Sequence, residues 1–96
     1  MLTAGQYVQM YSRWKAYSVK EPKYLVRYGF LIPGKYAYEL SWRYTPSREM
    51  IERIYTLLTV EITEKGVERC DQLTTQFSSL AGAEEYIRHE RKQLKM

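Results

Sequence analysis

The stretch of sequence that most constrains the fold is residues 24–44, which read YLVRYGFLIPGKYAYELSWRY. Apolar and aromatic residues recur at every second position on both sides of a central Pro-Gly pair, which is the pattern of two half-buried strands joined by a turn. A three-residue loop over 33–35 pairs Ile32 with Tyr36 and gathers ten such side chains on one face. These side chains are Tyr24, Val26, Tyr28, Phe30, Ile32, Tyr36, Tyr38, Leu40, Trp42 and Tyr44. A two-residue loop would split them between the two faces, so burial favours the three-residue loop.

A second hairpin is predicted in the C-terminal half. The sequence Glu-Lys-Gly at 64–66 is typical of a three-residue loop with glycine in third place, and β-branched residues concentrate before it. Strands over 55–63 and 67–77 then place Glu61 opposite Arg69, which is a favourable cross-strand charge pair. A helix over the second of these segments is the alternative, because its apolar residues also recur at helical spacing.

Helices are predicted at both ends of the chain. Residues 3–17 carry aromatic and apolar side chains at helical spacing, and Thr3 and Gln6 match a capping box. Residues 78–95 begin with two serines, either of which can cap a helix. They end with Arg and Lys, where the helix dipole favours positive charge.

Residues 45–53 are expected to form a short helix or helical turn, because Thr45-Pro46 is a common helix start. The whole chain, residues 1–96, is expected to be a single α+β domain. The fold class is a four-stranded antiparallel sheet made of two successive β-hairpins, with the N- and C-terminal helices packed on one face and the other face open.

The composition limits the chemistry and the location. The single cysteine, Cys70, excludes a disulfide framework or a cysteine-based zinc site within the chain and favours a reducing, cytoplasmic location. No run of 18 apolar residues is present, so no membrane-spanning segment is expected. The net charge is +4: residues 1–44 carry seven Lys or Arg against two Glu, and residues 45–96 carry eight against nine acidic residues. A basic half rich in tyrosine suits an acidic protein surface or nucleic acid.

The candidate catalytic groups are isolated in the sequence. His89 is the only histidine and lies among charged residues, and Asp71 is the only aspartate. The five glycines are scattered, so they do not form a phosphate-binding loop. A general base needs a positioned partner, and Glu85 beside His89 is equally well explained as a surface pair. We therefore expect neither enzyme activity nor a cofactor nor a bound metal.

The residues expected to contact a partner are basic. The candidates are Arg27, Arg43, Lys35, Lys20, Lys23 and Arg13. We expect a small non-enzymatic interaction protein that binds a protein or nucleoprotein partner and blocks or bridges it, as inhibitors encoded by phages and plasmids do; a homodimer is compatible with this role. The alternative is a nucleic-acid-binding module in which these cations contact phosphates while exposed tyrosines of the sheet stack on bases.

Overall fold

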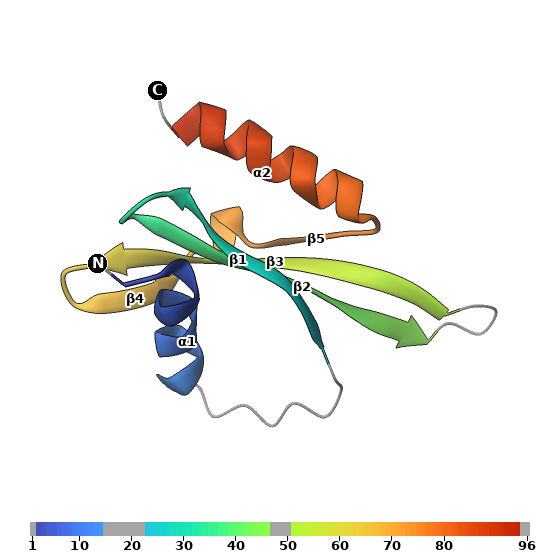
Figure 1. Cartoon of the computed structure of the whole chain (residues 1–96), viewed down its shortest axis with the longest axis horizontal. Helices are drawn as coiled ribbons and strands as arrows, with labels where there is room; N and C mark the ends of the chain where they lie inside the picture. Colours follow the sequence, from blue (N-terminus) through green and yellow to red (C-terminus); the bar gives the residue numbers. More distant parts are fainter. Residues whose placement is uncertain (1, 15–22, 47–50, 95–96) are drawn as a thin grey trace.

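The computed structural model describes residues 2–14, 23–46 and 51–94, which form an α+β fold (Figure 1). The elements are α1 (Ala4–Trp14), β1 (Tyr24–Ile32), β2 (Tyr36–Pro46), β3 (Ile51–Thr63), β4 (Gly66–Arg69), the short 3₁₀ turn η1 (Asp71–Leu73), β5 (Thr75–Phe77) and α2 (Leu80–Leu94). The strands pair in the order β1-β2-β3-β4, β5 also pairs with β3, and every pair is antiparallel. The predicted fold class, with successive hairpins and terminal helices on an antiparallel sheet, is confirmed.

The two helices cover opposite faces of the sheet. Along β2, Tyr38 and Leu40 point toward α2. Ala37 is the residue before Tyr38, so it lies on the other face of the sheet and points toward α1. The α2 core consists of Leu31, Tyr38, Leu40, Leu57, Leu73, Ala83 and Ile87, and the α1 core of Ala4, Val8, Tyr11, Ala37 and Val60. Figure 1 shows α2 above the sheet and α1 below it. The expectation that both helices pack on one face was therefore wrong, because the strands carry apolar residues on both faces and each face has to be buried.

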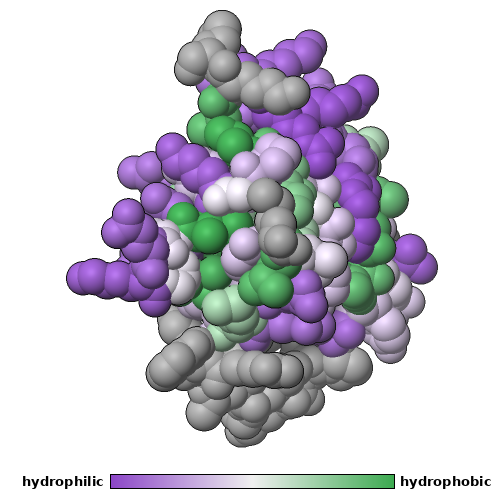
Figure 2. All heavy atoms as spheres, turned by 60° about the vertical axis from the view of Figure 1, so that its left-hand side comes forward, coloured by the Kyte–Doolittle hydropathy of each residue, from purple (hydrophilic) through white to green (hydrophobic). Residues whose placement is uncertain are grey.

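Two irregularities in β1 explain how one hairpin serves both cores. Ile32 pairs with Tyr36 as predicted, but Phe30 then pairs with Ala37 instead of Tyr38, which leaves one extra residue in β1. A second shift lies between Leu25 and Arg27. Each bulge exchanges the faces of the residues that follow, so the predicted single aromatic face does not form. On the end of the molecule shown in Figure 2, hydrophobic atoms accordingly reach the surface in separate patches among hydrophilic ones.

A long hairpin occupies the segment predicted as a short helix. β2 continues to Pro46 and β3 begins at Ile51, so a helix over 45–53 was wrong at the described positions; residues 47–50 lie outside the described part of the chain. The register runs from Tyr36↔Glu61 to Pro46↔Ile51 without a shift. Beyond the last pairs with β1 and β5, residues 43–46 and 51–54 form a two-stranded projection, called the arm below. Figure 1 shows the arm extending past the other strands.

The second hairpin has a tighter turn than predicted. Thr63 pairs with Gly66, so only two residues form the loop, and Gly66 adopts a φ of +133° that suits glycine. Glu61 consequently lies opposite Glu68, not Arg69. The predicted strand over 67–77 is divided into β4 and β5 by η1, and the alternative helix is realised only as that three-residue turn.

The helix caps follow the sequence signals. The Gln6 N–H donates to Thr3 Oγ1 over 3.2 Å, and the Thr3 N–H donates to Gln6 Oε1 over 2.8 Å, which confirms the predicted capping box. The Gly82 N–H donates to Ser79 Oγ over 3.1 Å at the start of α2. The predicted last turn of the first helix, residues 15–17, lies outside the described residues. Neither described helix is long and apolar enough to cross a membrane.

Candidate binding site

The structure places the Arg27 side chain, half-buried, on the face of β1 that α2 covers. One guanidinium nitrogen donates to Glu84 Oε2 over 2.7 Å and another contacts Glu84 Oε1, so the pair is bidentate. The Arg27 Nε also donates to the Tyr38 hydroxyl over 3.1 Å. These bonds hold the pKa of Glu84 below its usual value, chiefly through the hydrogen bonds from Arg27. Arg27 therefore ties α2 to the sheet, whereas the sequence suggested that it faces outward.

The Arg27–Glu84 pair should make stability depend on pH. Because the folded pKa of Glu84 is lowered from 4.5, the ion pair contributes fully above that pH, and the contribution is lost as the pH falls through the folded pKa. The free energy of unfolding, measured with urea, should differ most between wild type and Glu84→Gln near neutral pH. This difference should become smaller in acid. Since the two side chains are 39% and 35% exposed, the difference should be about 1 kcal/mol or less. A difference that stays constant with pH would contradict this account.

The remaining predicted residues are distributed over the molecule. Lys35 lies in the β1–β2 turn, where its ammonium group is 5.3 Å from the centre of the Tyr36 ring. Arg13 belongs to α1, but its side chain is not described, and Lys20 lies outside the described residues. Lys23 and Arg43 are the two predicted residues that the structure brings together.

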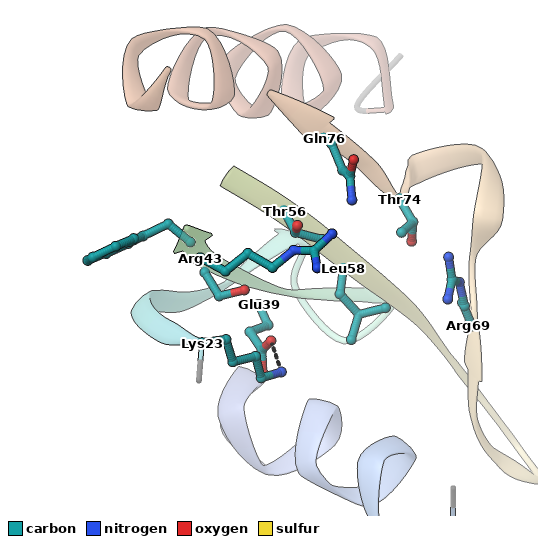
Figure 3. A pocket seen from close by; sticks show the side chains of 10 residues that line it. Lys23, Glu39, Arg43, Thr56, Leu58, Arg69, Thr74 and Gln76 are labelled. Atoms are coloured by element: carbon teal, nitrogen blue, oxygen red, sulfur yellow. Dashed lines mark hydrogen bonds and ion pairs between the residues drawn. The ribbon is translucent and has the colours of Figure 1, made fainter. Parts of the chain in front are cut away.

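Lys23 and Arg43 line a hollow of about 230 Å³, called the basic hollow below (Figure 3). The complete lining is Lys23, Glu39, Ser41, Trp42, Arg43, Thr56, Leu58, Arg69, Thr74 and Gln76. Most of these residues lie on the same face of the sheet as Ala37 and Val60, so the hollow opens on the α1 side of the sheet. Figure 3 shows side chains from β2, β4 and β5, and from Thr74 just before β5, arranged around the hollow.

The basic hollow combines three cations with one carboxylate. Lys23 Nζ lies 2.7 Å from Glu39 Oε1, and Glu39 is only 6% exposed, so Lys23 balances a buried negative charge. Arg69 Nε lies 2.7 Å from Asp71 Oδ1, but both of these side chains are well exposed. An exposed pair of this kind is weak, so the carboxylate of a partner can replace Asp71 at small cost.

The prediction from sequence missed Arg69. A three-residue turn would have set Arg69 opposite Glu61, whereas the two-residue turn sets it opposite Val60, on the α1 side. That one-residue difference moves the side chain to the other face of the sheet. The signal was present in the sequence, since glycine is also common at the fourth position of a type I turn. Gly66 is the fourth residue of the turn that forms here.

The exposed aromatic residues lie on the other side of the arm. The Trp42 ring stacks on Tyr24 with centroids 4.5 Å apart, and the Arg53 guanidinium lies 4.5 Å from the Trp42 centroid. Because β2 lies between β1 and β3, Trp42 is held between these two neighbours. Tyr44 meets the same ring edge-on at 4.9 Å. Trp42 also lines the basic hollow, but Tyr24 and Tyr44 do not, so only one of the three rings lies beside its cations.

The isolated reactive groups are not gathered at this hollow. Cys70 packs partly buried against the α2 core, and His89 is exposed on α2 beside Glu85, Arg88 and Lys92. Within the described residues, no group of three or more His, Cys, Asp or Glu side chains is placed to hold a metal ion. Comparison of the chain with protein-family models, curated proteins and solved structures gave no match.

Proposed function

We propose that this chain is a non-enzymatic interaction protein that binds an acidic surface of a protein or nucleoprotein partner and blocks or bridges that partner in the cytoplasm. The observation that carries the proposal is the convergence of Lys23, just before β1, with Arg43 of β2 and Arg69 of β4 on a hollow that α1 leaves open. Ser41, Thr56 and Gln76 add hydrogen-bonding groups, and Leu58 adds an apolar wall. Arginine together with polar and apolar groups is typical of protein interfaces.

The charge balance favours a protein partner over a nucleic-acid strand. Glu39 matches the charge of Lys23, and Asp71 lies against Arg69. A lining with three cations and one carboxylate suits one or two partner carboxylates better than a row of phosphates. Trp42 is already stacked between Tyr24 and Arg53, so it is not open to stack on a base. This supports the protein-binding role over the nucleic-acid alternative.

The test reverses one charge at the basic hollow. Arg43→Glu should abolish retention of the partner from a lysate of the native cell, because it places a carboxylate against the partner's acids. The variant should fold normally, since exposed substitutions usually change stability by about 0.5 kcal/mol or less. Lys65→Glu, in the exposed β3–β4 turn, makes the same charge change away from the hollow and should retain the partner.

The same three proteins should be titrated with labelled single- and double-stranded DNA and RNA at low and moderate salt. Tight, steeply salt-dependent binding that Arg43→Glu removes would favour the nucleic-acid module instead. Equal retention of the same proteins by wild type and both variants would contradict a role for the basic hollow.

A further inference from the structure

β3 is longer than the stretch of its outer edge that β4 and β5 cover. β5 pairs with β3 only from Thr75↔Leu57 to Phe77↔Tyr55, and the chain then turns into α2. β3 continues from Tyr55 back to Ile51 as part of the arm. In the described part of the chain, no strand lies beyond this edge (Figure 1).

The direction of the backbone groups at this edge follows from the register. The Cys70 N–H donates to the Thr59 carbonyl over 2.8 Å, so Thr59 directs its backbone groups away from β2. The β2–β3 register contains no shift between Thr59 and the end of the arm, so every second residue repeats this orientation. The N–H and C=O groups of Arg53 and Ile51 therefore point outward, where β5 has ended.

The edges at β1 and at the end of β2 carry features that prevent strand addition. β1 has two bulges, and the Arg91 guanidinium donates to the Phe30 carbonyl over 2.9 and 3.1 Å. β2 ends in Pro46, which has no N–H. The described edge of β3 from Ile51 to Ile54 has neither a bulge nor a proline. The Arg53 side chain lies over Trp42, so it is turned toward β2 and leaves the backbone edge accessible.

A second hollow lies where a strand continuing β5 would run. It has a volume of about 310 Å³ and is called the edge hollow. Its lining residues are Glu52, Arg53, Ile54, Gln76, Phe77 and Ser78. An added strand would place one of its α1-side side chains in this hollow, against Ile54 and Gln76. Gln76 also lines the basic hollow, but no other residue is shared between the two described linings.

We propose that the edge of β3 from Ile51 to Ile54 binds an extended segment of a partner protein as an added antiparallel strand in line with β5. The segment carries an acidic residue opposite Arg53 and an apolar residue that enters the edge hollow. This goes beyond the proposed function, since it specifies a second contact surface and the conformation of the ligand. Main-chain hydrogen bonds to Arg53 and Ile51 supply the binding, and the two side chains supply the specificity.

A second copy of the chain fits this edge less well. A two-fold axis at Arg53 would set the two arginines opposite each other. A two-fold axis one residue earlier would set Glu52 against Glu52. Like charges directly opposite each other destabilise a strand pair, so both registers confined to the described edge are unfavourable. A foreign segment with the opposite charge avoids this repulsion.

The experiment uses a displayed library of random linear peptides of about ten residues, selected on the full-length protein. Arg53→Pro removes the outward N–H without removing a bond to β2, so it should fold and should serve for counter-selection. Peptides that survive should bind wild type and Arg53→Ala, which keeps the N–H. Their affinity for Arg53→Pro should be weaker by about tenfold or more, as expected for loss of a main-chain bond across the interface. The selected peptides should bind Arg43→Glu as tightly as wild type. This result would distinguish binding at the edge of β3 from binding at the basic hollow.

Amide hydrogen exchange of the wild type provides the second measurement, which does not require Arg53→Pro to fold. A bound peptide should slow exchange of the Arg53 and Ile51 amides and leave Glu52 and Ile54, which face β2, nearly unchanged. The proposal is overturned if selected peptides leave the Arg53 amide exchanging freely, or if no peptide survives counter-selection against a folded Arg53→Pro. A wild-type dimer that Arg53→Pro converts to a monomer would overturn it in favour of a second copy.

Discussion

Replacing Leu57 with alanine should lower the free energy of unfolding by about 2–5 kcal/mol, as is usual for a buried leucine. Leu57 is 0% exposed, pairs with Leu40 in the centre of the sheet and belongs to the α2 core together with Ile87. The substitution removes apolar contacts and leaves a cavity that the sheet on one side and the helix on the other cannot close. Because a single domain is stable by only about 5–15 kcal/mol, the loss should be plain in urea unfolding followed by circular dichroism.

Leu80 provides a matched control for this substitution. It is 40% exposed at the start of α2. Leu80→Ala should therefore change stability by about 0.5 kcal/mol or less. Equal losses for the two leucine substitutions would contradict the placement of Leu57 in the α2 core.

Replacing Gly29 with alanine should be destabilising by about 1–3 kcal/mol, although alanine is otherwise no worse than glycine in a strand. A Cβ atom at this position would lie 2.5 Å from the Tyr38 hydroxyl oxygen and 2.6 Å from Tyr38 Cζ. Tyr38 is only 1% exposed, and its hydroxyl accepts a hydrogen bond from Arg27, so the ring has little room to withdraw. Thermal unfolding of the variant should show the loss directly.

A double-mutant cycle identifies the cause of that loss. Tyr38→Phe removes the hydroxyl that the new methyl group would meet, so Gly29→Ala should cost less in the Tyr38→Phe background than in wild type. If the two losses simply add, close approach of the tyrosine is not the reason for glycine at this position.

The parts of the fold that could be predicted are those encoded by a few consecutive residues. Thr3 and Gln6 form the predicted cap because the motif is local. The pairing of Ile32 with Tyr36 follows from the turn between them. The antiparallel hairpins follow from alternation within each strand. These signals involve neighbours in sequence, so tertiary packing does not overrule them.

The distribution of residues between the two faces could not be predicted in the same way. The bulges in β1 have no local sequence signal, yet each exchanges the faces of the residues that follow. Leu31 and Ala37 fall on the face of the hairpin opposite the ten predicted apolar residues. Both are buried, so their presence there was the available indication that both faces are covered. For the same reason the predicted binding residues lie on two different faces of the sheet. Arg27 binds Glu84 of α2 on one face, while Lys23 and Arg43 line a hollow together with Arg69 on the other.

The sheet separates two cores that share no side chain, one under each helix. Release of α1 would uncover Tyr28 and Phe30 while the strand ladder and the α2 core remain assembled. The α1 core and the α2 core are therefore two cooperative units on opposite faces of one sheet. Local opening of the α1 core requires less free energy than global unfolding. A ligand that displaced α1 would gain access to an aromatic surface without melting the rest of the protein.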